Sequence, residues 1–168
     1  MATSTLSSET IIGHYADGPA RLEAALSGLT DSELDLSLGK DAWSIRQIVH
    51  HIADGDDLWK MCIKAALGNR DGPFTLKWYW DMPQMEWSAS WSYASRSVES
   101  SLTLLDANRH HIVELLENVP DALEKSIRLQ PPHGDEVHIT VREVLEMQVR
   151  HMTGHTQDIQ AIRQAHGV

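Results

Sequence analysis

Histidines are unusually frequent in this sequence, with 10 among 168 residues, and two of them have a spacing that suits a metal ion. His151 and His155 lie four residues apart in a segment with helical periodicity, on or close to its apolar stripe. Residues at this spacing lie about 6 Å apart on one helix face, so both imidazoles can approach one cation at about 2.0 to 2.1 Å. The pair predicts two ligands of a divalent metal site.

His51 is the candidate for a third ligand. It lies at the edge of the apolar stripe of another predicted helix, over residues 45–67. Facing helices pack about 8 to 10 Å apart, so His51 can complete three corners of a tetrahedron with the other two imidazoles. A free fourth corner is typical of catalytic rather than structural metal sites. The plainer alternative is that the histidine spacing arises by chance in a histidine-rich chain.

The other histidines have less favourable positions. His50 is predicted on the opposite side of its helix from the apolar stripe, facing water, and His110 and His111 are also predicted to face solvent. Cys62 falls on a buried side, where a small core residue is the favoured interpretation over a ligand or nucleophile. No role is assigned to the histidines at 14, 133, 138 and 166.

A general base is not evident in the motifs. The His-Glu-x-x-His pattern of zinc proteases is absent because Met152 follows His151. Asp54 and Asp158 each lie three residues from a predicted ligand, and they are candidates for supporting that ligand or accepting a proton. Surface charge is the favoured alternative for both.

Two further features are open to more than one interpretation. Arg109 lies near an apolar stripe, so it needs a carboxylate partner or an anionic substrate group, unless its tip reaches solvent. Several aromatic residues crowd into one short stretch, where they line a substrate pocket, form a dimer contact or seal the end of the bundle. They are Trp78, Tyr79, Trp80, Trp87, Trp91 and Tyr93.

The elements that must position these residues are helices. Capping boxes at Ser44–Gln47 and Thr140–Glu143 predict the starts of helices over 45–67 and 141–166. A third helix is predicted over 93–118, and a first one from residue 7 or 8 to 29, kinked or restarted at Pro19. The connections 70–90 and 120–139 are long enough to cross the bundle. We therefore expect an all-α four-helix bundle with two long crossover connections, which allow parallel neighbours.

Composition limits the partners. The length predicts a single domain over residues 1–168. A formal net charge of -10 disfavours nucleic acid and anionic membrane surfaces. One cysteine, no signal-peptide pattern and no apolar run of membrane-spanning length favour a soluble protein of the reducing cytoplasm.

Two motifs resemble the DinB-like proteins, including their YfiT-type members. The first is WSIRQIVHHIAD, from Trp43 to Asp54, and the second is HMTGHTQDIQAIR, from His151 to Arg163. The resemblance implies a four-helix bundle with up-down-down-up connectivity, frequent homodimers and a divalent metal. It implies the same three ligands, His51, His151 and His155.

The resemblance implies enzymes of two classes. Some relatives resemble hydrolases, and others are S-transferases or isomerases that use a thiol such as bacillithiol, mycothiol or glutathione. We expect the metal to be zinc or nickel. A divalent metal suits both classes of enzyme, because it lowers the pKa of bound water or stabilises a bound thiolate. The main hypothesis is a metal-dependent hydrolase or thiol S-transferase acting on an unknown small molecule. The alternative is a non-catalytic, metal-stabilised binding protein.

Overall fold

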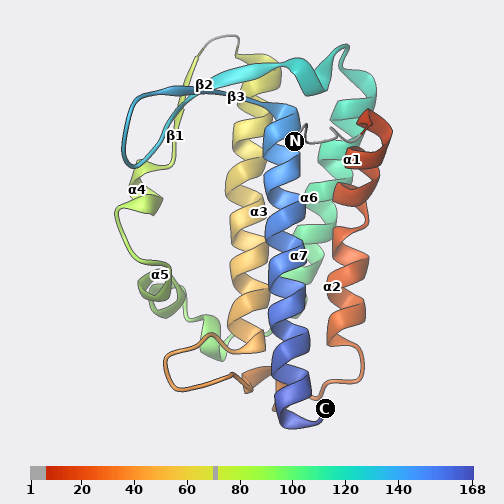
Figure 1. The fold of residues 1–168 in the computed structure, drawn as a ribbon, viewed down its shortest axis with the longest axis vertical. Helices are drawn as coiled ribbons and strands as arrows, with labels where there is room; N and C mark the ends of the chain where they lie inside the picture. The colour runs from red at the N-terminus through yellow and green to blue at the C-terminus, as the bar shows by residue number, and fades with distance from the viewer. Residues whose placement is uncertain (1–6, 70–71) are drawn as a thin grey trace, which may run out of the picture.

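A computed structural model describes residues 7–69 and 72–168, so the start of the predicted connection 70–90 lies outside the description. Four long helical units run side by side (Figure 1). The first unit is α1 and α2 end to end, and it runs antiparallel to α3 and α6, which are parallel neighbours, while α7 returns beside them (Figure 1). The bounds are α1 Ser8–Ala16, α2 Gly18–Leu26, α3 Ile45–Gly68, α6 Glu99–Asn118 and α7 Val141–His166.

Local sequence signals set these helix ends. The Ser44 hydroxyl accepts from the Gln47 N–H at 3.3 Å, and the Gln47 side chain accepts from the Ser44 N–H at 2.9 Å. The same reciprocal capping box starts α7 at Thr140. Pro19 lies in the first turn of α2, where a backbone N–H would have no partner within the helix, so the N–H that proline lacks is not missed. The predicted restart of the helix is confirmed. Gly167 ends α7 with a φ of 71°, a left-handed conformation that glycine adopts without strain.

The prediction of an all-α protein is wrong in one part, because a three-stranded sheet lies across one end of the bundle (Figure 1). Its strands are β1 Pro73–Thr75, β2 Ser126–Gln130 and β3 Val137–Thr140. Strands β1 and β2 are parallel, with Phe74 opposite Leu129, and β2 and β3 are antiparallel, with Ile127 opposite Ile139. Ile127 and Leu129 are buried against the helices, so the sheet closes this end of the core.

The connection between β1 and α6 contains most of the aromatic residues. It forms α4 Lys77–Trp80, α5 Gln84–Ser90 and the 3-10 helix η2 Tyr93–Ser95, and it runs along the outside of α3 (Figure 1). The predicted helix over 93–118 therefore begins later, at Glu99. Arg96 is extended and separates η2 from α6, and Ser92, with a φ of 55°, separates η2 from α5. We call residues 77–95 the cover segment. Two further 3-10 helices are η1 Glu33–Asp35 and η3 Ala122–Glu124.

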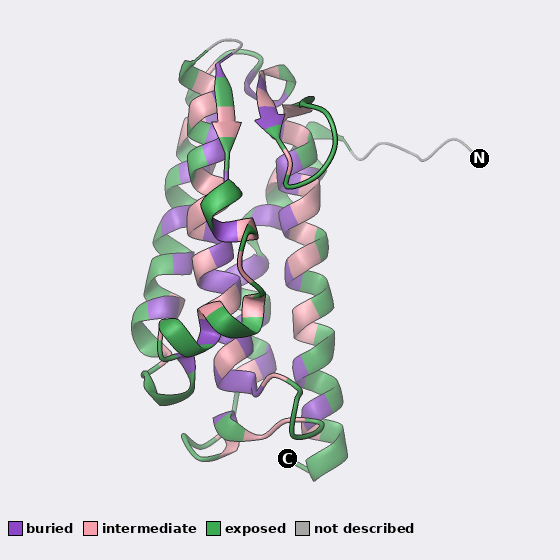
Figure 2. Ribbon diagram, turned by 90° about the vertical axis from the view of Figure 1, so that its left-hand side faces the viewer, coloured by how far each residue is buried: buried purple, intermediate pink, exposed green. Residues whose placement is uncertain are grey.

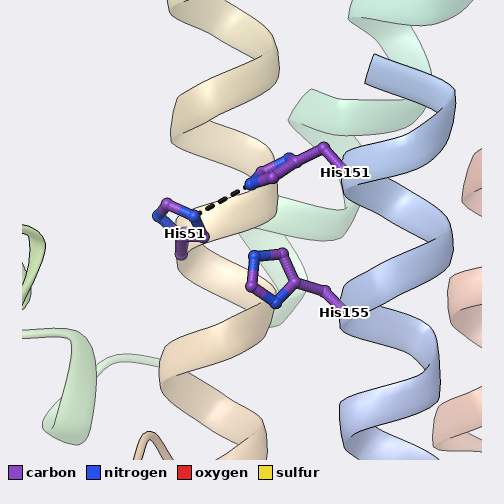
Figure 3. A group of neighbouring side chains, drawn as sticks. All are labelled: His51, His151 and His155. Atoms are coloured by element: carbon purple, nitrogen blue, oxygen red, sulfur yellow. Dashed lines mark hydrogen bonds between the residues drawn. The ribbon is translucent and has the colours of Figure 1, made fainter. Parts of the chain in front are cut away.

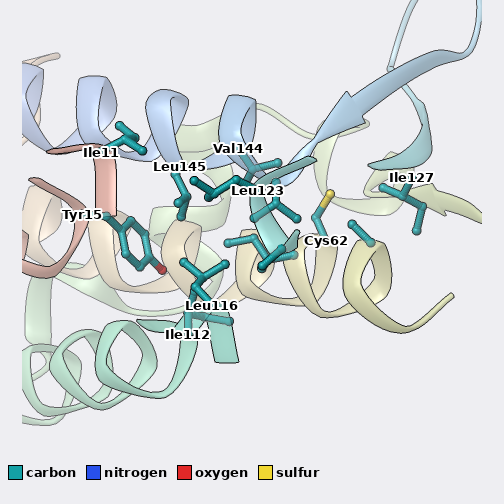
Figure 4. Close-up of a cluster of buried hydrophobic side chains, with 13 residues drawn as sticks. Ile11, Tyr15, Cys62, Ile112, Leu116, Leu123, Ile127, Val144 and Leu145 are labelled. Atoms are coloured by element: carbon teal, nitrogen blue, oxygen red, sulfur yellow. The ribbon is translucent and has the colours of Figure 1, made fainter. Parts of the chain in front are cut away.

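The inward faces of the long helices are buried and their outer faces are exposed (Figure 2). One apolar cluster lies near the sheet and includes Tyr15, Cys62 and Leu145 (Figure 4). A second cluster, with Leu22, Ile48 and Leu105, fills the other half of the bundle. Cys62 is fully buried, as predicted, and burial raises the pKa of its thiol to about 12.

Arg109 is buried inside the bundle with a carboxylate partner. Its Nε donates to Asp56 Oδ1 at 2.9 Å, its Nη1 donates to the Tyr15 carbonyl at 2.8 Å, and its guanidinium lies 4.4 Å from the centre of the Tyr15 ring. A Cβ at Gly18 would collide with the guanidinium, so this position requires glycine. Of the interpretations considered for Arg109, the carboxylate partner is confirmed.

Among the described residues, no helix has the length and apolar character needed to cross a bilayer.

Candidate metal centre

Three histidines from α3 and α7 converge between the two helices (Figure 3). His51 projects from α3, and His151 and His155 project from successive turns of α7. The Nε2 atoms of His51 and His151 lie 3.0 Å apart, and one ring nitrogen from each of the three side chains lies within 4.8 Å of the others. The structure therefore brings together the three residues that the spacing and the resemblance selected.

The arrangement of nitrogens fits a small divalent cation. Two nitrogens bound to one tetrahedral zinc ion are separated by about 3.3 Å, close to the separation between His51 and His151. His51 Nδ1 is buried and has no hydrogen-bond partner among the described protein groups. No fourth histidine, cysteine or carboxylate joins the cluster within the described part of the chain. The donor set is thus that of a site with three protein ligands and one free position.

Asp158 supports one of these rings. Its Oδ2 lies 3.0 Å from His155 Nδ1, one turn along α7. When Nδ1 carries the proton and donates it to the carboxylate, Nε2 keeps a free lone pair, which is the tautomer that a metal ligand needs. The side chain of Asp158 is 59% exposed, so it combines the surface position favoured from sequence with a contact to a predicted ligand.

Burial and mutual repulsion keep two of the rings neutral. Burial lowers the pKa of His51 to about 3, with a further contribution from positive charge on His151 and His155. Burial also lowers the pKa of His151 to about 4, and His155 and Arg109 add to this effect. Both rings are therefore uncharged at neutral pH, the form in which imidazole binds metal.

Two hollows meet at the histidines, and His51 lines both. The larger, which we call the Trp43 hollow, has a volume of about 430 Å³ and a mainly apolar wall. Its lining is Leu38, Ala42, Trp43, Ile48, His51, Gln84, His155, Asp158 and Ile162. The smaller, the Trp80 hollow, has a volume of about 190 Å³ and lies between α3, α7 and the cover segment. Its lining is His51, Gly55, Trp59, Tyr79, Trp80, Gln84, Met147, Gln148 and His151.

The prediction that His50 faces water is wrong. Its side chain is 0% exposed, with Nδ1 2.8 Å from Ser101 Oγ and Nε2 3.3 Å from the Arg96 carbonyl. The helical wheel assumed one buried stripe, whereas α3 packs against α6, α7 and the cover segment, so its buried arc is much wider. His110 and His111 are exposed, as predicted.

The cover segment bears on the interpretations left open for Asp54 and for the aromatic residues. Tyr93 donates from its hydroxyl to Asp54 Oδ2 at 2.6 Å, so Asp54 holds the cover segment rather than a histidine. The rings of Tyr79, Trp87 and Trp91 pack against one another with neighbouring centroids 4.8 to 6.1 Å apart. Trp80 lines a hollow, whereas Trp78 is 53% exposed. The aromatic residues thus pack along the side of α3 rather than at the end of the bundle, and Tyr79 and Trp80 line the site, while the dimer contact stays a prediction.

Sequence reasoning missed Trp43, Gln84 and Gln148 as site residues. The Trp43 ring lies edge-on to His51, with centroids 4.4 Å apart, and forms part of the wall of the larger hollow. Trp43 directly precedes the Ser44 cap, and its place eight residues before the predicted ligand His51 was the available signal. Gln84 comes from the cover segment, which carries no periodic pattern, and nothing in the sequence pointed to it.

Known proteins with a similar sequence share a metal-dependent description. A relative from Geobacillus kaustophilus, named as a candidate metal-dependent hydrolase, is 27% identical over 151 residues, which are 89% of this chain and 80% of the relative. A similarly named protein of Halalkalibacterium halodurans is 29% identical over 142 residues, 76% of this chain and 80% of its own.

Solved structures show the same fold. YfiT from Bacillus subtilis, described as a probable metal-dependent hydrolase with an unusual four-helix bundle topology, has a TM-score of 0.81 and 24% identity, covering 99% of this chain and 93% of its own. A mycothiol-dependent maleylpyruvate isomerase has a TM-score of 0.67 and 15% identity, and the match covers 92% of this chain and 61% of the isomerase. The sequence profile of the DinB superfamily matches residues 14–159. This chain belongs to the DinB superfamily.

Proposed function

We propose that the protein is an enzyme that depends on a divalent metal and acts on a small molecule. The observation that carries the proposal is the convergence of His51, His151 and His155 at the junction of two hollows. The three imidazoles would hold the ion and leave one position free for a reactant. When bound, the ion supplies Lewis-acid chemistry, which polarises a carbonyl group or activates a nucleophile at neutral pH.

The surrounding residues have separate tasks in this proposal. Asp158 fixes the orientation of the His155 ring through the bond at Nδ1. The Trp43 hollow, with Ile48 and Ile162 in its wall, accommodates the apolar part of a substrate and excludes water from the reacting atoms. Asp158 is the only carboxylate among the residues that line the two hollows, and we infer that orienting His155 is its primary role.

Hydrolysis is the first reaction class we propose, supported by the names of the sequence relatives. The second is transfer or isomerisation with a low-molecular-weight thiol, supported by the similarity of the fold to the mycothiol-dependent isomerase. The metal itself we expect to be zinc or nickel, because three imidazoles are favourable ligands for both ions. Elemental analysis of the purified protein identifies it.

The two reaction classes differ in their need for a thiol. The metal-loaded protein is assayed on activated esters and amides without thiol, then on electrophiles with bacillithiol, mycothiol or glutathione. Turnover without thiol supports a hydrolase, and turnover that requires thiol supports transfer. In both cases the His155→Ala variant should have no turnover. A protein that retains its metal but turns over none of these compounds would instead support a non-catalytic, metal-stabilised binding protein.

A further inference from the structure

Gln148 is a buried polar side chain next to the metal centre. It lies on α7 one turn before His151, and only 2% of its surface is exposed. Its Oε1 atom is buried and has no hydrogen-bond partner among the described protein groups. An unpaired buried acceptor is destabilising, and such groups are rare in folded proteins, so this one calls for an explanation.

The surroundings of Gln148 are those of a small binding cavity. It lines the Trp80 hollow together with Trp59, Trp80 and Met147, while His51 and His151 form the wall toward the metal centre. Gln84 also lines this hollow, but its Oε1 accepts from the Tyr79 hydroxyl at 2.5 Å. The hollow therefore contains one glutamine whose oxygen is paired and one whose oxygen is not. His51 Nδ1 is also unpaired, but it belongs to the metal centre, so the Gln148 oxygen is the unpaired acceptor on the side of the hollow away from the metal.

We propose that Gln148 recognises a hydrogen-bond donor on the substrate. The proposal rests on the function proposed above, and it specifies the substrate class. The substrate carries a hydroxyl, amide N–H or ammonium group close to its reacting atom, and an apolar part that occupies the Trp43 hollow. The reacting atom lies at the histidines, and the donor enters the Trp80 hollow. Rotation about the broad terminal torsion of the side chain turns Oε1 toward that donor.

The first test is thermal stability, which requires neither metal nor substrate. Gln148→Met keeps the size of the side chain and removes the unpaired acceptor, so we expect Tm to rise by about 2 to 4 °C. The matched control is Gln84→Met, which removes the acceptor of the Tyr79 hydroxyl and should lower Tm. A fall in Tm for Gln148→Met would show that its oxygen is already satisfied in the free protein, and would overturn the proposal.

The second test is selectivity between two thiols, one of which has its hydroxyl hydrogen replaced by a methyl group. The zinc-loaded protein is titrated with 2-mercaptoethanol, which has a hydroxyl, and with 2-methoxyethanethiol, which has the methyl ether. Wild type should bind the hydroxyl compound about five- to tenfold more tightly. Gln148→Met should lose this preference, whereas Gln160→Met, at an exposed position of α7 outside the lining of both hollows, should retain it.

The outcomes separate this inference from the proposed function. Equal binding of both thiols by wild type, or a preference that survives Gln148→Met, would overturn the role of Gln148 and leave the metal site standing. A protein that takes up no zinc would overturn the proposed function, and the role of Gln148 with it.

Discussion

The hydrogen bond between His155 and Asp158 determines which nitrogen of that ring is available to a metal. Asp158→Ala removes the acceptor at Nδ1, so the ring is free to turn and to change tautomer. We expect the affinity for zinc to fall about 10- to 100-fold, as measured by competition with a chromophoric chelator.

The matched control for this change is Asp106→Ala, because Asp106 forms a similar contact with His110, at 3.2 Å, on the surface of α6. That variant should bind zinc like wild type. Equal affinities for Asp158→Ala and wild type would show that Asp158 is merely a surface charge.

At the residue scale, the sequence predicted what depends on periodicity within one helix. The pair His151 and His155 was accessible because spacing alone places both rings on one face. His50 was misplaced because its burial depends on Ser101 and the Arg96 carbonyl, which lie 51 and 46 residues away. Gln148 was missed because an unpaired oxygen is a property of the packed structure, and no local pattern records it.

At the scale of elements, the ion pair of Arg109 and Asp56 ties α6 to α3, and Arg109 also binds the last turn of α1. Both side chains are at most 1% exposed. Arg109→Met leaves the carboxylate buried without its partner, so it should lower the free energy of unfolding by about 3 to 5 kcal/mol. Urea denaturation measures this loss.

The double variant Arg109→Met, Asp56→Leu is the control for this prediction. It removes both charges together, so it should recover most of the stability lost in the single variant. A double variant as unstable as the single one would show that shape, rather than charge, makes the pair important.

At this scale the sequence predicted the long helices and missed the short strands. The capping boxes located the starts of α3 and α7, because each box lies within four consecutive residues of the sequence. The sheet was missed because β1 has three residues and pairs with a strand more than 50 residues away. A usable signal was present in β2, where Ile127 and Leu129 alternate with less buried residues.

At the scale of the whole molecule, the neutral histidines make the stability of the metal-free protein depend on pH. The pKa values of His51 and His151 are lowered from 6.5 to about 3 and about 4, so below pH 6.5 the unfolded chain binds more protons than the folded one. This stability is complete above pH 6.5 and is lost as the pH falls toward the folded-state values. The slope reaches about 1.4 kcal/mol per pH unit for each histidine.

Denaturation of the metal-free protein at about pH 7.5 and about pH 5 measures this effect. The double variant His51→Asn, His151→Asn lacks both titrating rings and should lose less stability over that range. An equally steep loss in the double variant would assign the pH dependence to other groups.

We also propose that the protein is a homodimer that associates through the cover segment, where Trp78 and Met85 are 53% and 42% exposed. Sedimentation should give twice the 18.8 kDa of one chain. Trp78→Glu should shift the protein toward monomer, while Leu104→Glu, at a 37% exposed position on α6, should not. A wild-type mass of one chain at micromolar concentration would contradict the proposal.

The metal content of the purified protein and its single-histidine variants tests the central claim most directly. Wild type should contain close to one divalent ion per chain, and His51→Ala, His151→Ala and His155→Ala should each lose most of it. His110→Ala should retain the ion, and so should the folded fraction of His50→Ala, although its stability will be lower. Two results would contradict this account of the site: retention of the metal by His51→Ala, His151→Ala and His155→Ala alike, or its loss from His50→Ala together with its retention by His51→Ala.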